Sequence, residues 1–382
     1  MKNYLPSQYN LDSKLVIKHN YLKEQFSNYK AIFSKLEKVV QKGDYTLGNK
    51  VNEFESKISK LLNAKYVVAL GSGTDALMLS LKALGVKEGD EVITTPYTFY
   101  ATIGAIVTAG AKPIFVDVTD DYNIDPNLIE KKITKKTKAI LPVHWSGRIC
   151  DMKQIIKIAK KHSIPIGEDA CHAITATQGN KFAGNFGTFG CFSLHPLKNL
   201  NVWGDGGFLL TNSKKYYEKI LLLRNHGLIS RNINKIFGYN SRLDTVQAVV
   251  AIEILKKIKK ITNCRISNSK YLDSKLKKLP NIITKDRAPE NKEVFHLYEF
   301  RVLNNKLRNK IIKFLIKNKI DAKIHYPIPM HLQPASKIYG YKKGDFPVTE
   351  KLANTSISLP VHEFITKKKL DFIIKIIKKA IV

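Results

Sequence analysis

Short apolar runs and longer amphipathic stretches alternate through the first half of the chain. The runs are rich in β-branched and aromatic residues, which favours strands. The stretches between them repeat apolar residues every three or four positions, which favours helices. Strands are expected at 66–70, 91–95, 113–118, 139–144, 164–169, 191–195 and 207–211. Helices are expected between the first five, at Asp75–Leu84, Tyr100–Ala109, Asn127–Lys132 and Met152–His162. This alternation predicts an α/β protein with a mainly parallel sheet covered on both faces.

The pattern changes after about residue 250. A long lysine-rich helix is expected over Ala251–Leu279, followed by a strand at 294–303 and a helix around Leu307–Asn318. We therefore predict three parts: a helical N-terminal extension at 1–44, a large domain at 45–250 and a smaller C-terminal α+β domain at 251–382.

The net charge of +32 over 382 residues first suggests a nucleic-acid partner. However, 56 of the 64 cationic residues are lysine and eight are arginine. They are scattered through stretches such as ILKKIKK and KIIKKAIV, without aromatic residues among them. We therefore expect no nucleic-acid partner, and a preference for small anionic substrates is the better interpretation of the charge.

The four cysteines are Cys150, Cys171, Cys191 and Cys264. None forms a CxxC pair, and their spacing fits neither a metal site nor a disulfide framework. We expect reduced thiols and no metal. The N-terminus lacks an apolar signal-like segment, and no apolar run approaches the ~18 residues that a membrane span needs. These features predict a soluble cytoplasmic protein.

Small residues follow the first strand, in the segment GSGTDALMLSL at 71–81. Free N–H groups at a helix start suit a phosphate, and ligands of parallel sheets bind at the carboxyl ends of strands. The letters also fit G-x-G-x-x-A, but a nicotinamide-binding fold needs an acid at the carboxyl end of the second strand. Asp90 and Glu91 precede that strand, whereas its carboxyl end carries Tyr97 and Phe99. A nicotinamide site is therefore disfavoured, and a tight turn without a ligand stays open.

Two charged residues stand at other strand ends. Asp169 ends the fifth strand, where it could pair with a protonated ring nitrogen or, alternatively, cap a helix. Lys198 follows the sixth strand in CFSLHPLKNLNVWGDGG, and a partly desolvated lysine can act as a nucleophile or imine partner. A phosphate loop, the ring of Phe99, a carboxylate and a lysine in this order together indicate a pyridoxal phosphate (PLP) site.

The sequence resembles the DegT/DnrJ/EryC1/StrS family of PLP-dependent sugar aminotransferases. The resemblance covers roughly residues 20 to 375. It rests on YTLGNKVNEFE (45–55), ALGSGTDAL (69–77), TTPYTFYAT (94–102), PVHWSGRICDM (142–152), EDACHA (168–173), GTFGCFSLHPLKNLNVWGDGGFLLTN (187–212), LRNHG (223–227), GYNSRLDTVQA (238–248), YPIPMHLQPASKIYGYKKGDFPVTEKLA (326–353) and SLP (358–360). It implies the type I aminotransferase fold and a homodimer with active sites at the subunit interface.

The family pattern also implies roles for single residues. Lys198 would hold PLP as an imine, Asp169 would pair with the pyridine nitrogen, and Phe99 would stack on the ring. The other implied residues are His172 beside the ring hydroxyl, Gly73, Thr74 and Ser193 at the phosphate, Asn240 from the partner subunit, and Arg242 and His331 near the substrate.

Two departures from the family pattern lie close to the lysine. Many members have Ser-Phe-Tyr/His-Pro before the lysine, whereas this chain has SLHPLK with Leu194 and His195, and Trp203 stands where smaller residues are common. These departures affect the expected substrate subclass rather than the chemistry.

The predicted function is transfer of an amino group from an amino acid, with glutamate the expected donor, to a keto-sugar that is nucleotide-linked. Lys198 would serve as base and acid for the proton shift. The product would be an amino sugar for a surface glycan such as lipopolysaccharide, or for a secondary metabolite. One alternative is a PLP-type sugar dehydratase, but those relatives carry histidine at the lysine position. The other is a non-enzymatic regulatory protein, which would need neither Lys198 nor Asp169.

Overall fold

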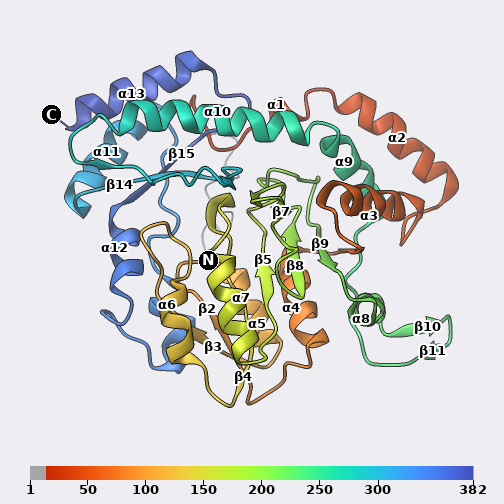
Figure 1. The fold of residues 1–382 in the computed structure, drawn as a ribbon. Helices are drawn as coiled ribbons and strands as arrows, with labels where there is room; N and C mark the ends of the chain where they lie inside the picture. The colour runs from red at the N-terminus through yellow and green to blue at the C-terminus, as the bar shows by residue number, and fades with distance from the viewer. Residues whose placement is uncertain (1–13, 382) are drawn as a thin grey trace.

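The computed structural model describes residues 14–381 and places a large domain beside a smaller C-terminal one (Figure 1). Residues 1–13 of the predicted N-terminal extension, and Val382, lie outside the described residues. Residues 22–42 of the extension contain two helices, α1 (Leu22–Gln25) and α2 (Tyr29–Lys42). No helix between residues 14 and 381 is long and apolar enough to cross a membrane.

One central sheet forms the large domain. Two ladders, β1-β9-β8-β5 and β3-β2-β4, are joined by parallel bridges from Ile140 to Ile166 and from Val143 to Asp169. All neighbouring strands run parallel except β9, which is antiparallel to both β1 and β8. The predicted mainly parallel sheet is therefore confirmed. Its strands are β1 (Tyr66–Leu70), β2 (Glu91–Thr94), β3 (Lys112–Phe115), β4 (Thr137–Ile140), β5 (Gly167–Asp169), β8 (Phe189–Ser193) and β9 (Gly207–Thr211).

Helices cover both faces of this sheet because successive strand residues point to opposite sides. In β1, Val67 and Ala69 join one core with α3 (Asn49–Leu62), α7 (Met152–Lys161) and α9 (Thr245–Leu255). Val68 and Leu70 join the other core, which contains α4 (Gly73–Ala83), α5 (Tyr100–Thr108) and α8 (Lys214–Arg224). The short helix α6 (Pro126–Ile129) lies in the segment between β3 and β4.

The small domain is built on an antiparallel sheet of β12 (Ile282–Ile283), β14 (Tyr298–Val302) and β15 (Ser356–Leu359). Its core also takes side chains from α10 (Ile258–Leu276), α11 (Asn305–Lys317) and α13 (Lys367–Ile381), and α12 (Pro347–Thr355) leads into β15. Ile17 belongs to this core and forms a parallel bridge with Ile320. The N-terminal segment around Ile17 therefore packs on the C-terminal domain, whereas Ile32 and Val39 of α2 belong to the large-domain core.

The helix predicted over Ala251–Leu279 is two helices, α9 and α10, separated at Lys256 and Lys257. Most of α9 is buried in the large-domain core, whereas α10 starts against that core and ends in the small-domain core. The break allows each helix to follow the core it packs on. The apolar pattern did not reveal it, because neither proline nor glycine interrupts the chain between the apolar α9 and the lysine-bearing α10.

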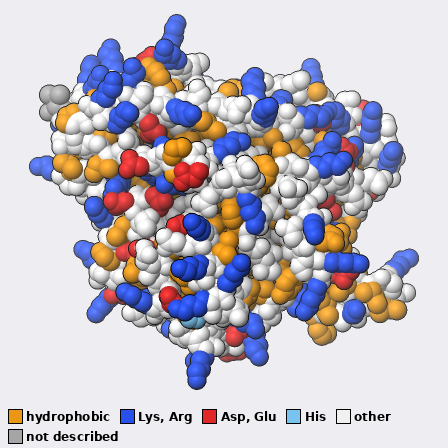
Figure 2. Space-filling model, in the orientation of Figure 1, with side chains coloured by type: hydrophobic (Ala, Val, Ile, Leu, Met, Phe, Trp, Pro, Cys, Tyr) orange, Lys and Arg blue, Asp and Glu red, His pale blue; other side chains and the backbone are white. Residues whose placement is uncertain are grey.

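Short strands complete the fold. They are β6 (Thr177–Gln178), β7 (Lys181–Phe182), β10 (Leu228–Ser230), β11 (Ile233–Asn234) and β13 (Asn291–Lys292). The β10–β11 hairpin projects from the large domain beyond α8 (Figure 1). On the face shown in Figure 2, Lys and Arg side chains are spread over the whole surface, with Asp and Glu among them.

Candidate active site

A cavity of about 300 Å³ lies at the carboxyl ends of the central strands. The large domain lines it with segments that follow β1, β2, β5 and β8. The small domain and the N-terminal segment line it from the other side, for example with Pro360 and Tyr21. Seven of the predicted site residues face this one cavity: Gly73, Thr74, Phe99, Asp169, His172, Ser193 and Lys198.

The N-terminus of α4 forms one wall. Ser72 caps the helix by accepting a hydrogen bond from the Asp75 N–H at 3.0 Å, while the N–H groups of Gly73 and Thr74 in the first turn lack intrahelical acceptors. A Cβ atom at Gly73 would lie 2.7 Å from the Cβ of Ser193, so only glycine allows α4 to approach β8 this closely. The N–H groups of Gly73 and Thr74 and the hydroxyl of Ser193 therefore lie together at a helix N-terminus. This arrangement is suited to a phosphate.

Asp169 ends β5 and is 5% exposed. Its Oδ2 accepts a hydrogen bond from Thr102 Oγ1 at 2.8 Å, and its Oδ1 accepts one from the Cys171 N–H at 3.2 Å. No helix begins in the turns that follow, so the alternative that Asp169 caps a helix is wrong. Among the described residues no cation lies within ion-pair distance of this carboxylate. A buried carboxylate with neutral donors alone suits a cationic group in the cavity.

Lys198 lies in the turn after β8 and is half-buried. Its N–H donates to the His195 carbonyl at 2.8 Å, which fixes the turn. Burial lowers the pKa of the Lys198 ammonium, against the opposing influence of Cys171 and Asp169. Within residues 14–381 no carboxylate forms an ion pair with it. A larger neutral fraction makes this amine a better nucleophile than a surface lysine.

His172 lies between other rings at the cavity wall. Its Nδ1 accepts a hydrogen bond from the Ser146 N–H at 3.3 Å, and its ring centroid lies 4.2 Å from that of His296. Burial, followed by the charge of Lys198, holds the pKa of His172 well below its usual value. The neutral ring with Nδ1 as acceptor carries its proton on Nε2, so it can donate one hydrogen bond.

Phe99 stands just before α5, with 46% of its surface exposed. Its ring lies 5.8 Å from that of Tyr326, which also lines the cavity. An exposed ring at a cavity wall offers a face to a flat ligand.

Three predicted residues do not line the cavity of their own chain. Asn240 is exposed and forms a bridge with Asn225, and Arg242 donates from Nη1 to Asn225 Oδ1 at 3.0 Å. His331 is buried beside Phe346, with its Nε2 3.1 Å from Glu350 Oε1. The predicted roles of Asn240, Arg242 and His331 therefore stay predictions.

The small domain and the N-terminal segment contribute cavity residues that the sequence pattern did not predict. Six of the ten histidines line the cavity: His19, His172, His195, His296, His325 and His362. His19 reaches it because Ile17 pairs with Ile320, a contact between the two ends of the chain. No local pattern signals such a contact. His325 stands directly before YPIPMH, which could have drawn attention to it.

Both domains line one cavity at the carboxyl edge of a mainly parallel sheet, and a lysine and a buried aspartate are among its lining residues. This architecture and site define an enzyme of the type I aminotransferase fold.

Comparison with known proteins gives the family. The chain belongs to the DegT/DnrJ/EryC1/StrS aminotransferase family, whose family model matches residues 27–378. It is 37% identical over 358 residues to the pleiotropic regulatory protein of Geobacillus stearothermophilus, with 93% of this chain and 95% of the relative covered. It is 35% identical over 339 residues to the UDP-2-acetamido-2-deoxy-3-oxo-D-glucuronate aminotransferase of Pseudomonas aeruginosa, with 88% and 92% covered. Among solved structures, S. venezuelae DesV in complex with a ketimine intermediate matches with a TM-score of 0.91 and 32% identity, covering 95% of this chain and 98% of DesV.

Proposed function

We propose that this protein is a PLP-dependent aminotransferase that moves an amino group from an amino acid to a nucleotide-linked keto-sugar. The observation that carries the proposal is that Asp169 and Lys198 line one cavity, each without an ion-pair partner among the described residues. Binding alone needs neither a buried unpaired carboxylate nor a desolvated amine.

The residues around the cavity fit the cofactor. The free N–H groups at the start of α4, with Ser193, would hold its phosphate. Asp169 would hold a proton on the ring nitrogen, and Phe99 would cover one face of the ring. His172 would donate from Nε2 to the ring hydroxyl.

PLP supplies an electron sink for the bond that must be broken at the amino-bearing carbon. Asp169 would strengthen that sink, because its charge would keep the ring nitrogen protonated. Lys198 would hold the cofactor, and its amine would serve as the base and acid that moves a proton during the reaction. The same residues serve both half-reactions, since donor and acceptor react in turn at one site.

Cations in the cavity favour anionic substrates. Arg265 and Lys323 line it in addition to Lys198, against the carboxylates of Asp169 and Asp205. We propose glutamate as the amino donor and a keto-sugar linked to a nucleoside diphosphate as the acceptor. The P. aeruginosa relative, whose named substrate is such a keto-sugar, supports the acceptor class.

The β10–β11 hairpin supports a homodimer. Phe237, just after β11, is 96% exposed, and Ile229 and Ile233 are also largely exposed. Asn240 and Arg242 follow at the base of this apolar hairpin. We propose that the hairpin packs on a second copy, and that Asn240 and Arg242 complete the partner's cavity.

Two alternatives are less favoured. A sugar dehydratase of this family would carry histidine where Lys198 stands. A purely regulatory role has support in the name of the G. stearothermophilus relative, but it leaves the Asp169–Lys198 arrangement unexplained. A cytoplasmic location and a link to lipopolysaccharide or another surface glycan stay predictions.

The experiment that tests the function follows the nitrogen atom. The protein with PLP is incubated with [15N]glutamate and a panel of UDP- and dTDP-linked 3-keto and 4-keto sugars. We expect 15N in one amino sugar by mass spectrometry and no transfer by Lys198→Ala. Absence of transfer across the panel, or loss of water from the sugar instead, would contradict the proposal.

A further inference from the structure

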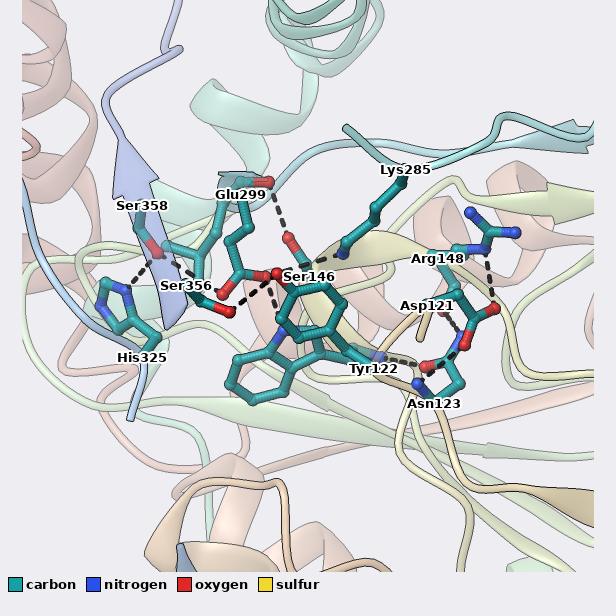
Figure 3. A network of polar contacts seen from close by, with 12 residues as sticks. Asp121, Tyr122, Asn123, Ser146, Arg148, Lys285, Glu299, His325, Ser356 and Ser358 are labelled. Carbon is teal, nitrogen blue, oxygen red and sulfur yellow. Dashed lines mark hydrogen bonds and ion pairs between the residues drawn. The ribbon is translucent and has the colours of Figure 1, made fainter. Parts of the chain in front are cut away.

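A line of polar contacts runs from the interior of the small domain to the cavity (Figure 3). It begins at Glu299 in β14, which is 2% exposed. Ser358 stands opposite Glu299 in the ladder between β14 and β15, and its Oγ lies 3.5 Å from Glu299 Oε1. On its other side, Ser358 Oγ lies 2.9 Å from the Nδ1 of His325, which lines the cavity.

The surroundings of Glu299 decide which way the Ser358 proton points. Glu299 Oε2 accepts a hydrogen bond from Trp145 Nε1 at 2.6 Å and lies 3.8 Å from the Lys285 ammonium. Glu299 Oε1 has Ser358 Oγ as its hydrogen-bond donor. If the hydroxyl pointed at His325, a buried carboxylate oxygen would lose that donor, which costs more than a weakened bond to a neutral ring. Ser358 therefore donates to Glu299.

The direction of that bond fixes the form of His325. A hydroxyl has one proton, so Ser358 Oγ must accept from His325, and the ring proton lies on Nδ1. Burial, followed by His19, Lys323 and Lys198, keeps the ring neutral by lowering its pKa to about 3. The Nε2 of His325 then carries a bare lone pair. Among the described residues no hydrogen bond reaches it, and it is not enclosed in the protein.

We infer that His325 contacts the acceptor substrate and that its Nε2 accepts a hydrogen bond from a hydroxyl of the sugar. Phosphate oxygens and a keto oxygen are acceptors themselves, so neither can pair with this lone pair. The preferred acceptor is thus a keto-sugar that retains a hydroxyl within reach of His325, and an analogue without that hydroxyl is discriminated against. Ser358 and Glu299 are positioning residues that set the ring proton. This inference rests on the proposed function.

The same strand provides a matched pair of variants. Ser356 and Ser358 are both fully buried in β15, but Ser356 Oγ lies 2.9 Å from Tyr122 OH, and the hydrogen bond of His325 goes to Ser358 instead (Figure 3). Ser358→Ala removes the acceptor of the Nδ1 proton, and Ser356→Ala removes an equivalent hydroxyl beside it. A third variant, His325→Phe, removes the ring nitrogens while keeping a flat side chain.

The first measurement is 15N NMR of histidine-labelled protein without substrate, with His325 assigned by its absence in His325→Phe. We expect the Nδ1–H form in the wild type and in Ser356→Ala, and a mixture of both ring forms in Ser358→Ala. An Nε2–H form in the wild type would overturn the inference. This readout does not depend on the reaction.

The second measurement separates the two half-reactions. The half-reaction with glutamate is followed by the absorbance of the cofactor. The half-reaction with sugar is measured with the nucleotide-linked keto-sugar that takes up 15N from glutamate, and with its monodeoxy analogues. We expect kcat/KM for the sugar half to fall at least tenfold more than for the glutamate half in Ser358→Ala and His325→Phe, but not in Ser356→Ala. We also expect His325→Phe to lose the wild-type preference for one hydroxyl. If the wild type transfers the amino group and Ser358→Ala and Ser356→Ala lose equal activity, this inference alone is wrong. If the wild type transfers no amino group, the proposed function is wrong as well.

Discussion

The carboxylate of Asp169 is held by Thr102 Oγ1 and the Cys171 N–H, two neutral donors that leave its charge free for a ligand. Asn at this position would keep the shape but lose the charge that holds the proton of the ring nitrogen. We expect Asp169→Asn to retain the cofactor while turnover falls at least 100-fold, as for other losses of a preorganised charge. The measurement is cofactor absorbance together with single-turnover rates. Turnover within a few fold of the wild type would mean that Asp169 has only a structural role.

Thr102→Val provides a graded comparison at the same site. It removes one neutral hydrogen bond to Asp169 and keeps the charge, so we expect a loss of roughly tenfold. The two variants together separate the effect of the carboxylate's charge from that of its orientation.

The β10–β11 hairpin and the segment after it give a prediction at the scale of elements. If Asn240 completes the partner's cavity, a mixed dimer of Lys198→Ala and Asn240→Asp chains has one site with both changes and one with neither. Each variant alone should be inactive, and subunit exchange should restore activity to a fraction of the dimers.

The control for this mixing experiment uses two residues, Lys198 and Asp169, that line the cavity of their own chain. Mixing Lys198→Ala with Asp169→Asn leaves one change in each site, so no recovery is expected. If heterodimers form and the Lys198→Ala and Asn240→Asp mixture stays inactive, Asn240 acts in its own subunit's cavity or not at all.

Elements were predicted well where the pattern is local. The strand ends at Leu70 and Asp169 were predicted at the observed residues, whereas β8 ends at Ser193, two residues before its predicted end. The cofactor candidates lie at or just after these ends. The break between α9 and α10 and the cavity role of His325 escaped prediction, because both follow from contacts between distant segments. His19 is the extreme case, since it depends on pairing between Ile17 and Ile320.

At the scale of the whole molecule, the neutral histidines of the cavity link stability to pH. Burial is the main cause that lowers the pKa of His325 and His362 to about 3 and that of His19 to about 4. The unfolded chain, with histidine pKa values of about 6.5, therefore binds more protons below that pH. The free energy of unfolding should fall as pH drops from about 6.5 towards 4, by up to about 1.4 kcal/mol per pH unit for each histidine.

Denaturant titrations at pH 7.5, 6.5 and 5.5 measure this dependence. We expect little change between the first two values and a marked loss of stability at the third. His362→Phe, which keeps a ring against Tyr21 but cannot be protonated, should reduce the loss. A stability that stays constant down to pH 5.5 would contradict neutral burial of these rings.

The central claim is that Lys198 is the one lysine among 56 that binds the cofactor covalently. Borohydride reduction of the yellow PLP-loaded protein, followed by proteolysis and mass spectrometry, tests it most directly. We predict that the reduced cofactor is found on the peptide containing Lys198 and that Lys198→Ala gives none. Labelling of another lysine, or no labelling of a protein that still transfers nitrogen, would contradict the account.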